Sequence, residues 1–319
     1  MTYTSSPNIP LILGIDGGAS KTVAMIADGQ GQVLARYQTA GSNKQVSGVQ
    51  ATLTHLYNAI EGVFRQADLP MQRVASACLG LSGVDRPSDI SLIRSWADSF
   101  QIAERLMIVN DARLVLAAGT PAGHGVGLIC GTGSIAFGRS PDGKMSRAGG
   151  WGYILGDEGS GYDIAIQAMR AATQAIDGRG QAYALRDALM QKWQINNPQE
   201  LIPFVYEHPD IRIHMLEVPL IVSALAEAGD SHSITILEHA AQMLSDIAVA
   251  AARQLNLSSC FPLAIAGSVL LKTPLLQQAL REHIQRHGYI AEPITPVEDP
   301  TLGALRMALQ LLMDEEFTH

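Results

Sequence analysis

Short apolar runs separated by turns dominate the first forty residues. Residues 11–15 form an apolar run, and apolar residues then alternate with other residues over 23–27 and over 33–37. The segment 28–31 between the last two runs, Asp-Gly-Gln-Gly, has the composition of a tight turn. The pattern predicts consecutive strands joined as hairpins, so the loop after residue 15 connects two strands and does not open a helix.

The same pattern returns in the middle of the chain. An apolar run at 126–130 meets a glycine and hydroxyl turn at 131–134, continues as an apolar run at 135–138, and reaches a second turn at 140–143. Two hairpins built alike in one chain predict a duplicated domain.

Between and after the hairpins, the periodicity predicts alternating helices and strands. The predicted strands are 74–80, 106–109 and 263–266 with a last one after 289, and the predicted helices are 48–66, 88–98, 112–118, several within 160–257, and a last one ending at 313. Glycine and proline at 120–123 mark a hinge. We therefore expect one domain over 1–119 and a second over 120–299, with a terminal helix over about 300–319 that packs back on the first domain.

Charge and hydropathy narrow the class of protein. The 319 residues include 22 Lys and Arg against 30 Asp and Glu, a net charge of −8, which disfavours non-specific binding to nucleic acid or to an anionic membrane. No apolar run in the sequence is long enough to span a bilayer, and the polar first ten residues lack the core of a signal peptide. We therefore predict a cytoplasmic protein with no nucleic-acid and no membrane partner.

The three cysteines are Cys78, Cys130 and Cys260. They stand in apolar, strand-like surroundings and lack the spacing of a metal site. We therefore predict three buried, reduced thiols and neither a disulfide nor a metal centre.

Glycines and hydroxyl side chains at the predicted strand ends are typical of anion-binding turns. Residues 131–134 follow an apolar strand, where backbone N–H groups are available to a phosphate, and the first loop at 14–22 adds a carboxylate and a lysine. The first loop is not a Walker A motif, because Ile15 and Ser20 stand where that motif needs glycines. Either turn alone could be purely structural, but the repetition favours a phosphate site.

A series of motifs in fixed order resembles one known family. The motifs are Gly14 to Thr22, Leu79 to Asp85, Asn110 to Ala112, Gly131 to Ser134, Gly149 to Gly161, Ala264 to Val269 and Pro300 to Ala304. They resemble, nearly end to end, N-acetylglucosamine kinases of the BadF/BadG/BcrA/BcrD ATPase group in the actin-like sugar kinase superfamily. Ala19 and Ser20 depart from the usual Gly and Thr; the serine keeps the hydroxyl, whereas Ala19 adds a methyl group beside the expected phosphates.

The resemblance implies a fold, a reaction and partners. The implied fold is α/β, with two duplicated ribonuclease-H-like (actin-like ATPase) domains, an interdomain cleft, and a second domain enlarged by helices. The implied reaction is ATP-dependent phosphorylation of N-acetyl-D-glucosamine at the 6-hydroxyl, with ATP and Mg²⁺ as cofactors. An amino sugar and ATP are the expected small-molecule partners, and we expect a homodimer.

The resemblance also implies a role for individual residues. Asp16 is the implied Mg²⁺ partner, and Asp111 is the implied general base that accepts the proton of the sugar alcohol. The residues implied to bind ATP are Gly17, Gly18, Ser20, Lys21, Thr22, Gly131, Thr132, Gly133, Ser134, Gly267 and Ser268. The residues implied to bind the sugar are Asn43, Ser82, Gly83, Thr132, Gly150, Trp151 and Asp157.

Several of these residues also have a plain structural interpretation. Asp111 could cap the helix that follows it, and Asn110 could fill the same role. Asp16 and Asn43 could be ordinary turn residues. Trp151 could belong to the core, although a tryptophan between glycines is better suited to covering a sugar face.

Other functions within the superfamily stay open at the level of sequence. An ATPase that activates radical dehydratases would hold an iron–sulfur cluster, but the three cysteines are not placed for one. A sugar-responsive repressor would need a DNA-binding domain before residue 11 and a zinc motif, and a non-catalytic nucleotide switch would not need both Asp16 and Asp111. Glucosamine and N-acetylmuramic acid are alternative acceptors. Whether the site admits the lactyl group of N-acetylmuramic acid depends on the shape of the cleft and on a nearby cation.

Overall fold

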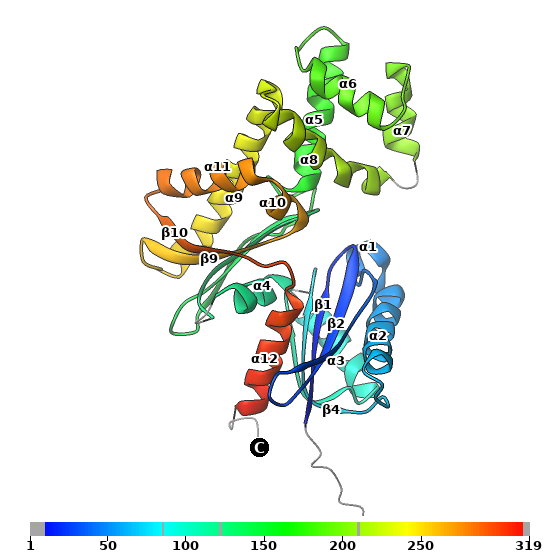
Figure 1. Cartoon of the computed structure of the whole chain (residues 1–319), viewed down its shortest axis with the longest axis vertical. Coiled ribbons are helices and arrows are strands. Elements are labelled where there is room, and N and C mark those ends of the chain that lie inside the picture. Colours follow the sequence, from blue (N-terminus) through cyan, green and yellow to red (C-terminus); the bar gives the residue numbers. More distant parts are fainter. Residues whose placement is uncertain (1–9, 85, 121–122, 209–210, 315–319) are drawn as a thin grey trace, which may run out of the picture. The chain divides into compact units, whose positions relative to one another are not determined.

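We describe the protein from a computed structural model, which describes residues 10–84, 86–120, 123–208 and 211–314. The chain divides into two compact units. Unit 1 comprises the residues up to Gly123 together with those from Asp299 onward, and unit 2 comprises His124–Glu298 (Figure 1). Unit 2 is therefore inserted into the sequence of unit 1.

Unit 1, within its described residues, is built on a five-stranded sheet. The strands lie in the order β3 (Val33–Ala40), β2 (Lys21–Asp28), β1 (Leu11–Gly17), β4 (Val74–Leu81) and β5 (Ala103–Val109). The first three strands follow one another through tight turns and pair antiparallel, whereas β1, β4 and β5 pair parallel. Parallel strands need crossover connections, and the helices between them supply these.

Helices cover both faces of this sheet. One face packs against α2 (Val49–Gln66) and α3 (Pro87–Ser99), and the other packs against α4 (Asp111–Gly119) and α12 (Thr301–Met313). A short helix, α1 (Lys44–Ser47), precedes α2. Gly303 permits α12 to approach α4 closely, because a Cβ there would lie 2.0 Å from the Leu114 carbonyl oxygen. The last described helix of the chain is thus part of the core of unit 1.

Unit 2 repeats this sheet. Its described strands lie in the order β8 (Met145–Gly149), β7 (Ser134–Arg139), β6 (Gly125–Cys130), β9 (Cys260–Ala266) and β10 (Ile290–Pro296). Again the first three pair antiparallel, and β6, β9 and β10 pair parallel. The repeated order and orientation are those of the predicted α/β fold with a duplicated domain.

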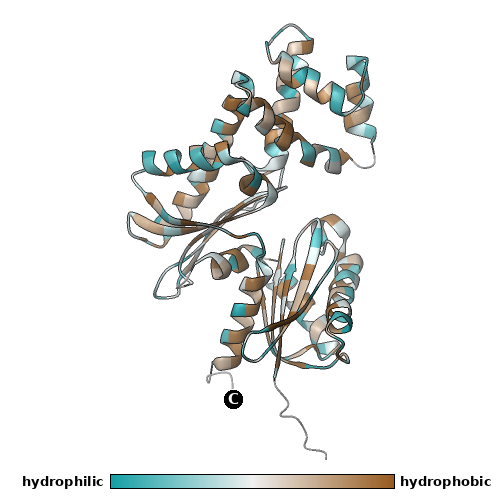
Figure 2. Cartoon of the chain, viewed as in Figure 1, coloured by the Kyte–Doolittle hydropathy of each residue, from teal (hydrophilic) through white to brown (hydrophobic). Residues whose placement is uncertain are grey.

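The second unit is enlarged by helices inserted between β8 and β9. These are α5 (Gly161–Ile176), α6 (Tyr183–Lys192), the 3-10 turn η1 (Pro198–Glu200), α7 (Leu201–Glu207), α8 (Ile211–Glu227) and α9 (Ser231–Gln254). Alanines line the buried sides of α5 and α9, which lets these helices approach their neighbours closely. Figure 2 shows brown, hydrophobic segments in the strands and in the helices packed on them, with teal at many turns and helix ends.

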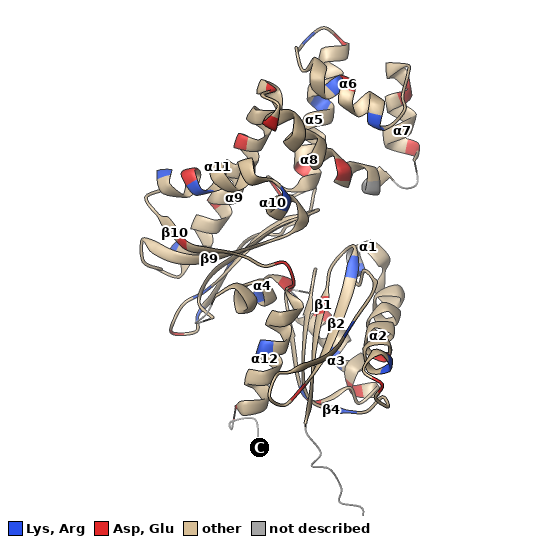
Figure 3. Ribbon diagram, in the orientation of Figure 1, with Lys and Arg blue, Asp and Glu red and all other residues tan. Residues whose placement is uncertain are grey.

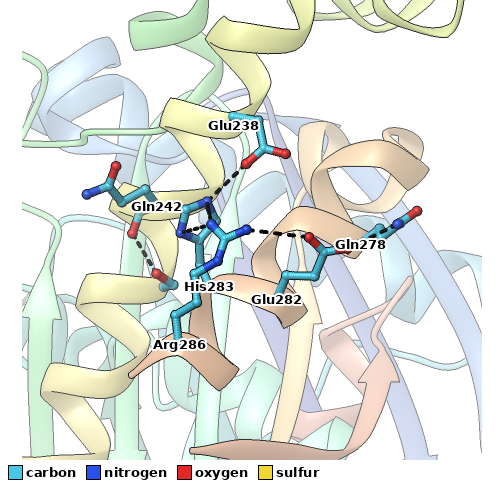
Figure 4. Close-up of polar contacts among 7 residues, drawn as sticks. Glu238, Gln242, Gln278, Glu282, His283 and Arg286 are labelled. Atoms are coloured by element: carbon cyan, nitrogen blue, oxygen red, sulfur yellow. Dashed lines mark hydrogen bonds and ion pairs between the residues drawn. The ribbon is translucent and has the colours of Figure 1, made fainter. Parts of the chain in front are cut away.

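Helices α10 (Ser268–Lys272) and α11 (Pro274–Arg286) follow β9. Beside the apolar contact between α11 and α9 lies a polar row, drawn in Figure 4. His283 Nε2 lies 3.1 Å from Glu238 Oε2, and Arg286 Nη2 lies 3.7 Å from Glu282 Oε2. His287, one turn further, lies 2.8 Å from Asp246. Partly exposed pairs of this kind contribute little stability each.

Two of the three cysteines match the prediction from sequence. Cys78 and Cys130 are buried free thiols, and burial raises the pKa of each to about 12. The prediction was wrong for Cys260, which is exposed. Cys260 is the first residue of β9, and the strand becomes buried only after it. An apolar sequence context therefore did not mean burial at the strand end.

Charged residues of both signs are scattered over both units (Figure 3). Of the helices in the described part of the chain, none combines the length and apolar character that a bilayer crossing requires.

Candidate functional site

The predicted residues of unit 1 gather at one edge of its sheet. Strands β1, β4 and β5 are parallel, so their carboxyl ends meet at the same edge. Asp16 stands at the end of β1, Ser82 follows β4, and Asp111 follows β5 after one residue. Ligands of open α/β sheets bind at such an edge.

The turn after β1 is tightly enclosed on one side. A Cβ added at Gly17 would lie 2.3 Å from Ser42 Oγ and 2.5 Å from Leu81 Cδ2, so a larger residue does not fit. The Ser82 amide donates to the Gly17 carbonyl at 2.8 Å, which ties the turn to the end of β4. Gly17 thus fixes the backbone next to Asp16, while Ser20 and Lys21 are exposed.

Asp16 has an unusual acidity for an aspartate. Burial and the negative charge of Asp111 raise its pKa from 3.8 to about 7, and Asp299 adds to the rise, whereas the positive charges of Lys21 and Arg36 oppose it. A buried carboxylate whose pKa is raised by a second carboxylate is characteristic of catalytic and cation-binding sites.

Asp111 is the first residue of α4 and is partly exposed. Asn110 is the N-cap, because its side-chain oxygen accepts a hydrogen bond from the Ala112 amide at 3.0 Å. Capping therefore explains Asn110 and does not explain a carboxylate at position 111.

This acidic edge fits Mg²⁺ by the chemistry of its donors. Magnesium prefers carboxylate oxygens, usually takes one or two from the protein, and keeps several waters or phosphate oxygens. Within the residues that the structure describes, no group of three or more His, Cys, Asp or Glu side chains could hold a metal. The pair of Asp16 and Asp111 meets the smaller requirement, and a cation would relieve the repulsion between them.

A segment at 41–44 connects the predicted sugar contact to the phosphate turn. The Ser42 amide donates to the Gly18 carbonyl at 3.0 Å, and Asn43 Nδ2 donates to Ser82 Oγ at 3.1 Å. The next residue, Lys44, pairs with the buried carboxylate of Asp89 on α3. Asn43 is nearly buried and held in a fixed orientation, unlike an ordinary turn residue.

Thr22 requires a correction. It was expected to face ATP, but it is fully buried and its hydroxyl donates to Ser42 Oγ at 2.9 Å. The second residue of β2 points into the sheet packing, so its side chain supports the 41–44 segment and is not exposed to a phosphate.

The predicted residues of unit 2 gather at the corresponding edge. Strands β6 and β9 are parallel, and the turns that follow them begin at Gly131 and Gly267. A Cβ added at Gly131 would meet its nearest neighbour, Gly267 Cα, only at 3.9 Å. A methyl group would therefore fit at Gly131 in ordinary contact with the backbone of Gly267 and Ser268, unlike at Gly17.

The hydroxyls of this turn differ in their surroundings. Thr132 and Ser268 are exposed. Ser134 is buried and its hydroxyl donates to the Glu158 carbonyl at 2.8 Å, so this side chain holds the following loop and is not placed to contact ATP directly. The expected contact of Ser134 with ATP is corrected accordingly.

The loop at 149–157 lies beside the second turn. A Cβ added at Gly133 would lie 2.7 Å from Asp157 Oδ2, so this carboxylate covers the turn. Asp157 has a φ of +60°, a conformation that a non-glycine residue adopts at some energetic cost and that is found often at functional sites. Trp151 is 68% exposed, which excludes it from the core.

Asp157 also has a perturbed acidity. Burial raises its pKa, and the charge of Glu158 adds to this, whereas hydrogen bonds from the Gly152 and Ser134 amides and the charge of Arg147 lower it. The Gly152 amide donates to Asp157 Oδ1 at 3.3 Å, so the carboxylate closes the loop that carries Trp151.

Each unit thus brings its own predicted residues together. Unit 1 collects Asp16, the 17–21 turn, Asn43, Ser82, Gly83 and Asp111, and unit 2 collects the 131–134 turn, Gly150, Trp151, Asp157, Gly267 and Ser268. Sequence reasoning missed Lys44, Asp89 and Arg147, which hold these residues in place. Of these three, Arg147 is the one that the sequence could have indicated, because it stands two residues before the Gly-Gly-Trp motif.

Comparison with known proteins agrees with this fold. The chain is 34% identical to the N-acetyl-D-glucosamine kinase of Dictyostelium discoideum over 94% of its length and 98% of that protein. It is 30% identical to the N-acetylmuramic acid/N-acetylglucosamine kinase of Clostridium acetobutylicum over 93% of its length and 97% of that protein. A solved structure from Chromobacterium violaceum, described as a candidate N-acetylglucosamine kinase, superposes with a TM-score of 0.72 at 28% identity and covers 96% of this chain and 100% of its own.

The family model of the BadF/BadG/BcrA/BcrD ATPases matches residues 13–308. The match includes both hairpins, both sheets and most of α12, and it agrees with the duplicated ribonuclease-H-like architecture. The chain therefore belongs to the BadF/BadG/BcrA/BcrD ATPase family.

Proposed function

We propose that this protein transfers the γ-phosphoryl group of ATP to the 6-hydroxyl of N-acetyl-D-glucosamine. That it is an ATP-dependent amino-sugar kinase follows from its family and from relatives of nearly the same length. The observation that carries the finer proposal is that two carboxylates, Asp16 and Asp111, lie at the carboxyl edge of the unit 1 sheet, where the charge of Asp111 helps to raise the pKa of Asp16.

Asp111 would act as the general base. Its carboxylate would orient the sugar alcohol and accept its proton as the phosphoryl group departs from ADP. A low pKa suffices for this task, because the proton leaves late in a loose transition state and alignment supplies much of the rate. Capping by Asn110 leaves Asp111 available for such a role.

Asp16 would hold Mg²⁺, directly or through water, with Asp111 nearby. When bound, the ion would offset the negative charge of the outer phosphates of ATP. The turns at 17–21 and 131–133 would offer backbone N–H groups to the phosphates, and Gly267 with Ser268 would border the rest of the nucleotide. Asn43, Ser82, Gly83, Thr132, Gly150, Trp151 and Asp157 would contact the sugar.

N-acetylmuramic acid is the second candidate acceptor, favoured by the dual activity in the name of the Clostridium relative. We further propose that the protein is cytoplasmic and forms a homodimer.

A phosphorylation assay tests the reaction. Purified protein is incubated with ATP and MgCl₂ and with N-acetylglucosamine, N-acetylmuramic acid, glucosamine or glucose in turn, and ADP release is measured. We expect the highest kcat/KM with N-acetylglucosamine and a product phosphorylated on O6 by NMR. ADP release that no sugar stimulates would contradict the kinase assignment, and a phosphate on O1 would contradict the proposed acceptor atom.

A further inference from the structure

Arg147 makes an unusual set of contacts with the loop that follows it. The residue lies on β8, two positions before Gly149. Its Nε donates to the Gly149 carbonyl at 3.3 Å, and its Nη2 donates to the Gly150 carbonyl at 2.5 Å. The same guanidinium lies over the ring of Trp151, with Cζ 5.4 Å from the ring centroid. One side chain therefore contacts three consecutive residues, of which Gly150 and Trp151 belong to the proposed sugar site.

The opposite side of the loop is held by other groups. The Gly150 amide donates to the Ser134 carbonyl at 2.9 Å, and the Gly152 amide donates to Asp157 Oδ1 at 3.3 Å. Trp151 lies between these attachments with 68% of its surface exposed, so apolar packing does not fix its indole. The orientation of the indole consequently depends on polar attachments, and the Arg147 guanidinium lies over the ring itself.

The chemistry of guanidinium suits this task. Its planar fork donates in two directions while its face stacks on an aromatic ring, and lysine cannot do both. Two donors aimed at carbonyls within the same short loop fix the planes of the Gly149–Gly150 and Gly150–Trp151 peptides as well as the ring beyond them. A solvated surface arginine would not need this geometry.

We propose that Arg147 is a positioning residue that holds the Gly150 carbonyl and the Trp151 indole for recognition of the acetamido group of the acceptor. The inference rests on the proposed function, since it assigns selectivity at the same site. Without Arg147, the indole would sample several orientations, and the enzyme would lose affinity for N-acetylated sugars more than for glucose.

The kinetic test uses the full-length enzyme with Arg147→Gln and Arg147→Lys. The matched control is Arg186→Gln, because Arg186 also lies over a ring, 5.0 Å from the centroid of Tyr183, and donates to Asp187 at 2.7 Å. We expect Arg147→Gln to lower kcat/KM for N-acetylglucosamine by about 10 to 100 fold, mostly through KM, and to leave glucose within about threefold. Arg147→Lys should restore only part of the loss, and the control should match the wild type.

A second measurement reads the loop without any sugar. The chain has three tryptophans, so protein labelled with 5-fluorotryptophan should give three ¹⁹F signals, and Trp151→Phe assigns the one of interest. Arg147→Gln should move and broaden the Trp151 signal, leave the other two unchanged, and increase quenching of Trp151 by iodide. The Arg186 control should change none of the three.

The outcomes separate the two proposals. An unchanged Trp151 signal in Arg147→Gln, or equal losses with N-acetylglucosamine and glucose, would overturn the positioning role. If the wild type neither phosphorylates nor binds any amino sugar, the proposed function fails. A shifted Trp151 signal in Arg147→Gln would then still show that Arg147 orients the loop. The assignment of this role to acetamido recognition would nevertheless be rejected.

Discussion

The two units share one sheet but place different chemistry at the same edge. In unit 1 the central strand β1 ends in Asp16, and the outer parallel strand β5 leads to Asp111. In unit 2 the equivalent strand β6 ends in Cys130 and Gly131, and its neighbour β9 leads to Gly267 and Ser268. The two units thus share a topology, whereas the strand ends of unit 1 lead to carboxylates and those of unit 2 lead to glycine and hydroxyl turns.

The turn after β1 is more crowded than the turn after β6. Gly17 is enclosed by Ser42 and Leu81, whereas a Cβ at Gly131 would meet its nearest neighbour, the Gly267 backbone, only at 3.9 Å. A closed turn beside two acids suits a group that must be held rigidly, and an open turn suits a ligand that enters and leaves. The comparison teaches that the turn of unit 1 is enclosed and lies beside two carboxylates, whereas the turn of unit 2 is less crowded at Gly131.

The largest expected effect comes from Asp111→Asn, compared with Asp157→Asn in unit 2. Removing the proton acceptor should lower kcat by roughly 10² to 10⁴ fold with little change in KM for either substrate. Asp157→Asn should instead raise KM for the sugar, because that carboxylate organises the Trp151 loop. Steady-state kinetics with both substrates varied distinguishes the two; near-normal kcat in Asp111→Asn would move the base elsewhere, with Asp157 the next candidate.

The second prediction concerns the two glycines. Gly17→Ala should destabilise the protein by about 1 to 3 kcal/mol, since the new methyl must displace Ser42 or Leu81. Gly131→Ala should leave the free energy of unfolding within about 1 kcal/mol of the wild type. It should raise KM for ATP, because the new methyl group would stand beside the proposed phosphate contact. Urea denaturation measures the free energy of unfolding, and kinetics with varied ATP measure KM. Equal losses of stability in the two variants would show that the two turns are equally crowded.

The third prediction uses the pKa of Asp16, which folding raises from 3.8 to about 7. The fold favours the protonated form, so the stability that this group contributes is complete below about pH 4 and is lost as the pH rises through about 7. The unfolding free energy of the wild type minus that of Asp16→Asn should therefore fall between pH 5 and pH 8 in magnesium-free buffer. A difference that is flat or rises with pH would contradict this, and no such slope is expected for an Asp142→Asn control.

Most of the fold could be predicted from the sequence because its signals are local. The turn at 28–31 and the alternation on either side of it predicted the hairpin of β2 and β3, and the helix predicted at 48–66 is observed at 49–66. The repetition of the hairpin at 126–138 was enough to suggest duplication. Cys260 failed because burial at a strand end depends on what packs there, and this is absent from local pattern.

Side-chain partners in the candidate site were less predictable. Thr22 and Ser134 carry the hydroxyls expected near a phosphate, yet both are used to hold neighbouring segments. Lys44 meets Asp89 across forty-five positions of sequence, a pairing that no periodicity indicates. Contacts of this kind depend on how helices are laid on the sheet, so they follow from the tertiary structure alone.

The smallest expected effect is on the outer helices of unit 2. His287→Gln removes the pair with Asp246 but leaves the apolar contact of α11 with α9 intact. Because the pair is partly exposed, the free energy of unfolding should change by less than about 1 kcal/mol. The kinetic constants should equal those of the wild type, and a large loss of activity would show that these helices influence the site.

The position of α12 sets an order for folding during synthesis. The helix completes the core of unit 1, and Ser76 on β4 donates to its Ala308 carbonyl at 2.7 Å. All of unit 2 is translated before α12 emerges from the ribosome. Unit 2 can therefore fold first as a contiguous segment, while the nascent unit 1 waits for α12 with one face of its sheet covered only in part, by α4.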